Sequence, residues 1–122
     1  MKVLAIENQP EYFEMLQMVM DGIGHSIILA KDGIEALRIL EKEKIDVIMS
    51  DVSMPARDGI ELHRLIRAKP EHKETPFIFL TGVTNLKEIK QECSSPGDLM
   101  LQKPVSVERL LTMFSGQIKP LP

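Results

Sequence analysis

The sequence has little cysteine, few aromatic residues and no long apolar run. Cys93 is the only cysteine among 122 residues, which excludes an internal disulfide and a multi-cysteine zinc site. No segment approaches the roughly 18 apolar residues that a membrane span requires, and no charged-then-apolar leader opens the chain. These absences predict a soluble protein of the cytoplasm.

Charge of neither sign dominates the sequence. The formal net charge is −3, and the charged residues are spread along the chain rather than gathered in a run. This pattern argues against direct binding to nucleic acid or to an anionic membrane. The length and the 43% hydrophobic content suit one packed domain. We expect a domain over residues 1–118, with 119–122 as a tail or the start of a linker.

Short apolar runs alternate with helix-forming segments five times along the chain. Five runs are predicted to be strands: Val3–Ile6, Ser26–Ala30, Val47–Met49, Pro76–Leu80 and Leu99–Leu101. Hydrophobic residues recur at helical spacing between them, as in Phe13, Leu16 and Met20. Near-continuous apolar strands separated by helices are typical of a parallel sheet covered on both faces. The predicted fold class is therefore α/β, a doubly wound sandwich with right-handed crossovers.

Residues with strong local preferences predict where several helices begin and end. Pro10 suits a first helical turn, and Gly22 suits the end of that helix. Asp32 is predicted to be an N-cap, because Glu35 follows it at the spacing of a capping box. A third helix is expected after Gly59.

Polar side chains follow four of the five predicted strands, where each strand ends. They are Glu7, Asn8, Asp51, Thr81 and Lys103. In an open parallel sheet the carboxyl ends of the strands form the edge at which ligands bind. Any one of these residues alone could be structural, for example a helix cap or a surface ion pair. Their convergence on one edge favours a shared chemical role.

This set of side chains suits phosphoryl chemistry. Two carboxylates about 4 Å apart repel by about 4 kcal/mol at an effective dielectric of 20, and Mg²⁺ with oxygen ligands removes that repulsion. A carboxylate beside Mg²⁺ can attack phosphorus to form an aspartyl phosphate. A hydroxyl and an ammonium then stabilise the anionic phosphoryl oxygens.

Residues 51–59, DVSMPARDG, resemble the phospho-acceptor loop of the receiver domains of two-component response regulators. Residues 32–37, Leu80–Gly82 and Lys103–Pro104 are similar to other receiver segments, so the resemblance covers essentially the whole chain. It implies a flavodoxin-like (βα)5 fold with strand order 2-1-3-4-5. It also implies a cis peptide between Lys103 and Pro104.

The resemblance further implies a role for each edge residue. Asp51 would accept a phosphoryl group from a sensor histidine kinase or a phosphotransfer protein. The Thr81 hydroxyl would move toward that group, and Lys103 would pair with it. Mg²⁺ would be held at four positions: Glu7, Asn8, Asp51 and the backbone carbonyl of Ser53.

Two further sets of positions follow from the resemblance. The face formed by the fourth helix, fifth strand and fifth helix, with Thr81 and Met100, would bind an output partner that the sequence does not identify. Ser53 and Val83 would border the approach of the hydrolytic water. Because Ser53 is short and Val83 offers no hydrogen bond, a long-lived phosphorylated state is expected.

The sequence departs from the family pattern at three places. Glu7 and Asn8 stand where the family usually has two acids, which implies a weaker Mg²⁺ site. Met100 replaces the usual aromatic residue of the fifth strand, and Pro96-Gly97 replaces the usual Gly-Ala before it. These departures leave open an alternative, a pseudo-receiver that docks its partner without phosphorylation.

The sequence gives little support for other activities. Haloacid-dehalogenase-type phosphatases usually carry a second acid two residues after the nucleophile, where this chain has Ser53. A flavin site would require a phosphate-binding loop after the first strand, and none is evident there. The chain is therefore expected to be no enzyme beyond phosphotransfer to Asp51 and its reversal by hydrolysis. His63 is predicted to be a solvated residue of the third helix.

Overall fold

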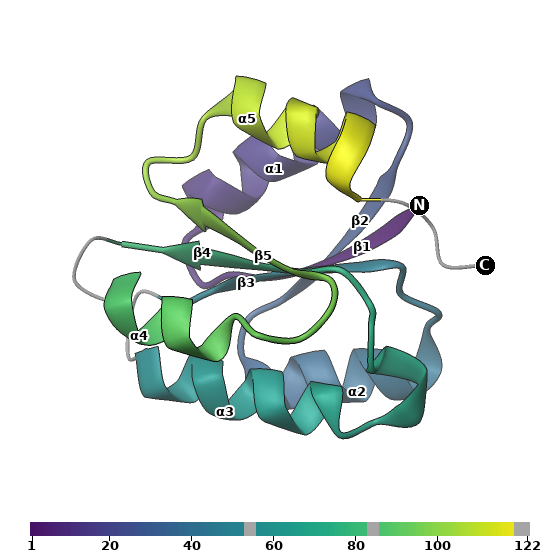
Figure 1. Ribbon diagram of the computed structural model, residues 1–122. Coiled ribbons are helices and arrows are strands. Elements are labelled where there is room, and N and C mark those ends of the chain that lie inside the picture. Colours follow the sequence, from purple (N-terminus) through teal and green to yellow (C-terminus); the bar gives the residue numbers. More distant parts are fainter. Residues whose placement is uncertain (53–55, 83–85, 119–122) are drawn as a thin grey trace.

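A five-stranded parallel sheet forms the middle layer of the fold (Figure 1). The computed structural model describes residues 1–52, 56–82 and 86–118. The strands are β1 Lys2–Ile6, β2 Ser26–Ala30, β3 Val47–Asp51, β4 Phe77–Thr81 and β5 Asp98–Gln102. Their order is β2-β1-β3-β4-β5, and every neighbouring pair is parallel. The predicted fold class and strand order are both confirmed.

Helices cover both faces of the sheet. The helices are α1 Pro10–Gly22, α2 Gly33–Lys42, α3 Ala56–Arg67, α4 Leu86–Glu92 and α5 Val107–Thr112, with the short turns Pro70–His72 and Met113–Gln117. Figure 1 shows α1 and α5 on one face and α2, α3 and α4 on the other. Across the described ranges no helix is long and apolar enough to cross a membrane. The predicted tail, residues 119–122, lies outside the part of the chain that the structure describes.

The core has two halves because side chains alternate along each strand. Val3 and Val47 are buried against the α1 and α5 side, whereas Leu4 and Ile48 are buried on the side of α2, α3 and α4. Because helices cover both faces of the sheet, the strands are apolar on both faces. The central strands therefore fix the positions of the residues at their ends.

Local signals in the sequence place most helix ends correctly. Helix α1 begins at Pro10 and ends at Gly22, and Asp32 Oδ1 accepts a hydrogen bond from the Glu35 N–H at 2.8 Å. Helix α3 is present as predicted, but its predicted start is wrong, because the helix begins at Ala56 and contains Gly59. Gly59 lies against the side chain of Val52 at the end of β3. Glycine here allows close helix–strand packing rather than marking a helix start.

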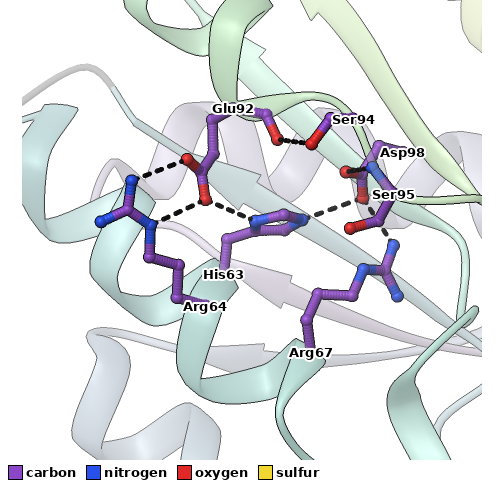
Figure 2. Close-up of polar contacts among 7 residues, drawn as sticks. All are labelled: His63, Arg64, Arg67, Glu92, Ser94, Ser95 and Asp98. Carbon is purple, nitrogen blue, oxygen red and sulfur yellow. Dashed lines mark hydrogen bonds and ion pairs between the residues drawn. The ribbon is translucent and has the colours of Figure 1, made fainter.

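His63 is buried, so the prediction that it is solvated is wrong. It lies on α3 with 2% of its surface exposed, and its ring contacts Phe77 and Phe79 at centroid distances of 4.9 and 4.8 Å. Its Nδ1 lies 3.1 Å from Glu92 Oε1, and its Nε2 lies 2.9 Å from Asp98 Oδ1 (Figure 2). Both ring nitrogens of His63 therefore face carboxylate oxygens, one from Glu92 and one from Asp98.

Two arginines extend this network on either side of His63 (Figure 2). Arg64 Nε and Nη2 donate to the two Glu92 carboxylate oxygens, and Arg67 Nη2 lies 2.6 Å from Asp98 Oδ1. Burial alone raises the pKa of Asp98, but hydrogen bonds from His63, Arg67 and the Ser95 N–H together lower that pKa below its usual range. The network joins α3 to the end of α4 and the start of β5.

We expect Gly59→Ala to destabilise the protein by about 1–3 kcal/mol. The added Cβ would overlap Val52 Cγ1 and lie 2.9 Å from Val52 Cβ. The matched control is Gly22→Ala, where a Cβ meets nothing within 4 Å and helix propensity favours alanine by up to about 1 kcal/mol. Urea unfolding of both variants measures the contrast, and equal stability of the two would contradict the packing role of Gly59.

Asp98→Asn is expected to lower the free energy of unfolding by about 3–5 kcal/mol at pH 7, since it leaves the buried Arg67 guanidinium without its carboxylate. The stability that Asp98 contributes is present above the unfolded-state pKa and is lost as pH falls through its lowered folded-state pKa. The difference in the free energy of unfolding between wild type and variant should therefore become smaller below about pH 4. Urea unfolding at pH 7 and pH 3 checks this, and a difference that stays constant would count against it.

Candidate functional site

The carboxyl ends of the strands bring the predicted edge residues together. Glu7 follows β1, Asp51 ends β3, Thr81 ends β4, and Lys103 follows β5. Lys103 Nζ lies 3.0 Å from Asp51 Oδ1 and 3.8 Å from Glu7 Oε2. The Lys103 backbone N–H donates to the Thr81 carbonyl at 2.8 Å, which continues the β4–β5 pairing past the strand ends. The peptide between Lys103 and Pro104 is cis, as predicted.

The charged groups of this edge are largely removed from water. Glu7 is 2% exposed, and the side chains of Asp51 and Lys103 are 6% and 11% exposed. Burial and then the negative charge of Asp51 raise the pKa of Glu7 to about 7, although Lys103 and a hydrogen bond from the Gln9 N–H act in the opposite direction. The edge therefore has a deficit of positive charge.

Three predicted metal-ligand positions line one cavity of about 460 Å³. These positions are Glu7, Asn8 and Asp51. Glu7 Oε2 is buried and has no hydrogen-bond partner among residues 1–52, 56–82 and 86–118. A buried carboxylate oxygen that accepts no hydrogen bond, beside a second carboxylate and an amide, fits a hard cation such as Mg²⁺. Within the same ranges no three His, Cys, Asp or Glu residues cluster as a metal site. A cation at this edge would therefore need Asn8 and further oxygen ligands, such as backbone carbonyls or water, in addition to the two carboxylates.

The fourth predicted metal position, Ser53, lies outside the described residues, and so does Val83. The structure therefore gives no placement for the two residues predicted to control the lifetime of a phosphoryl group. The predictions for Ser53 and Val83 remain predictions from the sequence.

The two predicted switch residues lie on neighbouring strands. Thr81 is buried, and its hydroxyl donates to the Gly82 carbonyl at 3.1 Å. Met100 pairs in register with Phe79 and packs, half-buried, against the core on the side of α2, α3 and α4. The arrangement places Thr81 at the edge and Met100 two register positions below it, on the strand that faces α4.

Sequence reasoning missed Tyr12 as a member of this site. Lys103 Nζ lies 4.2 Å from the centroid of the Tyr12 ring. Tyr12 is the only tyrosine in the chain, and it lies in the first turn of α1, four residues after Asn8. That position in the first turn was the available signal.

Comparisons with known proteins all find response regulators or their receiver domains. The family model described as response regulator receiver domain matches residues 3–115. The chain is 32% identical over 119 residues to response regulator MprA of Mycobacterium leprae, a match that covers 98% of this chain and 51% of MprA. The chain thus spans about half the length of that relative.

Two solved structures illustrate the similarity of fold. The chemotaxis response regulator CheY4 of Vibrio cholerae matches with a TM-score of 0.80 and 33% identity, covering 93% of this chain and 95% of CheY4. The receiver domain of sensor histidine kinase PA1611 from Pseudomonas aeruginosa matches with a TM-score of 0.79 and 28% identity, covering 96% of each chain. That second structure is described with a magnesium ion coordinated in the active site cleft.

Proposed function

The chain belongs to the response regulator receiver domains of two-component signalling, and we propose that it accepts a phosphoryl group on Asp51. The observation that carries this proposal is the Asp51 carboxylate held 3.0 Å from the Lys103 ammonium, beside the buried carboxylate of Glu7. The donor would be a partner histidine kinase or a phosphotransfer protein. This role makes the domain a signalling module rather than an enzyme acting on a separate substrate.

For the phosphoryl transfer, the protein needs only to position the reacting groups and to stabilise their charge. An Asp51 oxygen attacks the phosphorus of a phosphohistidine, so an O–P bond forms while the N–P bond breaks. The electron pair of the broken bond stays on the histidine nitrogen, which takes a proton from water. Lys103 stabilises the negative charge on the phosphoryl oxygens, and no general base is needed because Asp51 attacks as a carboxylate.

Mg²⁺ is the cofactor that these ligands support best. Glu7, Asn8 and Asp51 would hold it, together with the backbone carbonyl of Ser53 as the family resemblance implies. When bound, the ion supplies positive charge to the transferred group. Two observations support the assignment: Glu7 Oε2 accepts no hydrogen bond from the described residues, and this edge has a shortage of positive charge.

The response to phosphorylation is proposed to run through Thr81 and Met100. The Thr81 hydroxyl would turn from the Gly82 carbonyl toward the phosphoryl group, and packing around Met100 would fill the space that it leaves. Methionine has several rotamers of similar energy, so this repacking is less costly than moving an aromatic ring. The resulting change would be read on the face formed by α4, β5 and α5 by an output domain or protein.

We expect acetyl phosphate and Mg²⁺ to add one phosphoryl group to the purified protein and none to the Asp51→Asn variant. The adduct should be an acyl phosphate, which is labile to base. Intact-mass spectrometry measures the labelling of wild type and variant, before and after treatment with base. Equal labelling of the variant would reject Asp51 as the acceptor, and a wild-type protein that stays unlabelled with Mg²⁺ bound would favour phosphorylation-independent docking.

Asn8→Asp is expected to tighten Mg²⁺ binding, because it adds an anionic oxygen ligand to the set. The gain should be about 1–2 kcal/mol, the size of a charge-assisted contact. Calorimetric titration of the two metal-free proteins gives the comparison. Equal affinities would show that position 8 is no ligand.

A further inference from the structure

Lys103 lies against an aromatic ring as well as two carboxylates. Its ammonium is 4.2 Å from the centroid of the Tyr12 ring, 3.0 Å from Asp51 Oδ1 and 3.8 Å from Glu7 Oε2. The Lys103 side chain is only 11% exposed. A cation over a ring face is attracted by the ring quadrupole, and this attraction is stronger where water is excluded. The Tyr12 contact thus falls in the stronger range of such interactions.

The position of Tyr12 is fixed by the same edge that holds Lys103. The Gln9 N–H donates to Glu7 Oε1 at 3.0 Å, and the Tyr12 N–H donates to the Gln9 carbonyl at 3.2 Å. Pro10 opens the helix between them. Two consecutive hydrogen bonds, both through Gln9, therefore link the backbone of Tyr12 to the Glu7 carboxylate.

The three neighbours of Lys103 differ in how they respond to a divalent cation. Glu7 and Asp51 are carboxylates, which are ligands that Mg²⁺ binds. A bound cation would neutralise their charge and repel the ammonium. The Tyr12 ring is uncharged and offers Mg²⁺ no oxygen from its face, so its attraction for Lys103 persists when the carboxylates are occupied.

We propose that Tyr12 is a positioning residue that holds the Lys103 ammonium beside Asp51 when Mg²⁺ occupies the carboxylates. Its use in phosphotransfer rests on the proposed function, because Lys103 must be in place as the phosphoryl group arrives. The ring face is the part that acts. The phenol oxygen takes no part in the contact, so phenylalanine serves equally well.

The experiment compares Tyr12→Leu with Tyr12→Phe, two variants that keep an apolar side chain in the first turn of α1. NMR of the Lys103 side chain reads the contact directly, with the resonance assigned by its absence in a Lys103→Arg variant. In wild type and Tyr12→Phe, the protons next to the ammonium should be shifted upfield by the ring, with and without Mg²⁺. In Tyr12→Leu this shift should be absent, and Mg²⁺ should further move the resonance toward that of a solvated lysine.

Phosphorylation kinetics then read the consequence. At Mg²⁺ concentrations that saturate each protein, the rate of labelling by acetyl phosphate should fall by about three- to thirtyfold in Tyr12→Leu. Tyr12→Phe should restore the wild-type rate to within about twofold. A change in Mg²⁺ affinity alone would leave the rates at saturation equal.

Two outcomes overturn the inference. The first is a Lys103 resonance that is the same in wild type and Tyr12→Leu with Mg²⁺ bound. The second is a lost shift with an unchanged rate of labelling, which would make the contact merely structural. Failure of the wild-type protein to be labelled at all would count against the proposed function, and the Mg²⁺-loaded spectra would then decide the role of Tyr12 by themselves.

Discussion

The ion pair between Lys103 and Asp51 reaches across β4, because Asp51 ends β3 and Lys103 follows β5. A lysine side chain is long enough to cover that distance while its stem stays packed. Glu7, from β1 on the far side of β3, completes a row of charges along one edge of the sheet. The arrangement depends on parallel strands ending at the same level, so the sheet register determines the geometry of the site.

The strand that carries Lys103 is anchored at both ends. β5 is an outer strand of the sheet, and within the described part of the chain it pairs only with β4. At its start, Asp98 binds His63 and Arg67 of α3, and just past its end Lys103 binds Asp51. A five-residue outer strand has few backbone hydrogen bonds of its own. The polar contacts at its two ends hold it in register, which keeps Lys103 opposite Asp51.

The sequence could predict the fold and most of the site, because both depend on local patterns. Apolar runs with helical spacing between them fix the strands, and the polar residues at the strand ends identify Glu7, Asp51 and Lys103. The burial of His63 was not predictable in this way, since histidine is polar and its partners Glu92 and Asp98 are 29 and 35 residues away. The contact between Tyr12 and Lys103 was not predictable for the same reason, because only the folded chain brings the start of α1 against Lys103.

Asn8 stands where the family usually has a second acid, and this neutral residue changes the charge balance of the edge. Glu7 and Asp51 carry two potential negative charges against the one positive charge of Lys103, and burial makes the second negative charge costly. A second acid at position 8 would add to that repulsion in the metal-free protein. The neutral amide avoids this cost but gives a divalent cation less charge to bind. Asn8 therefore limits the repulsion among the polar groups of this edge, where Glu7 and Asp51 already lie beside Lys103.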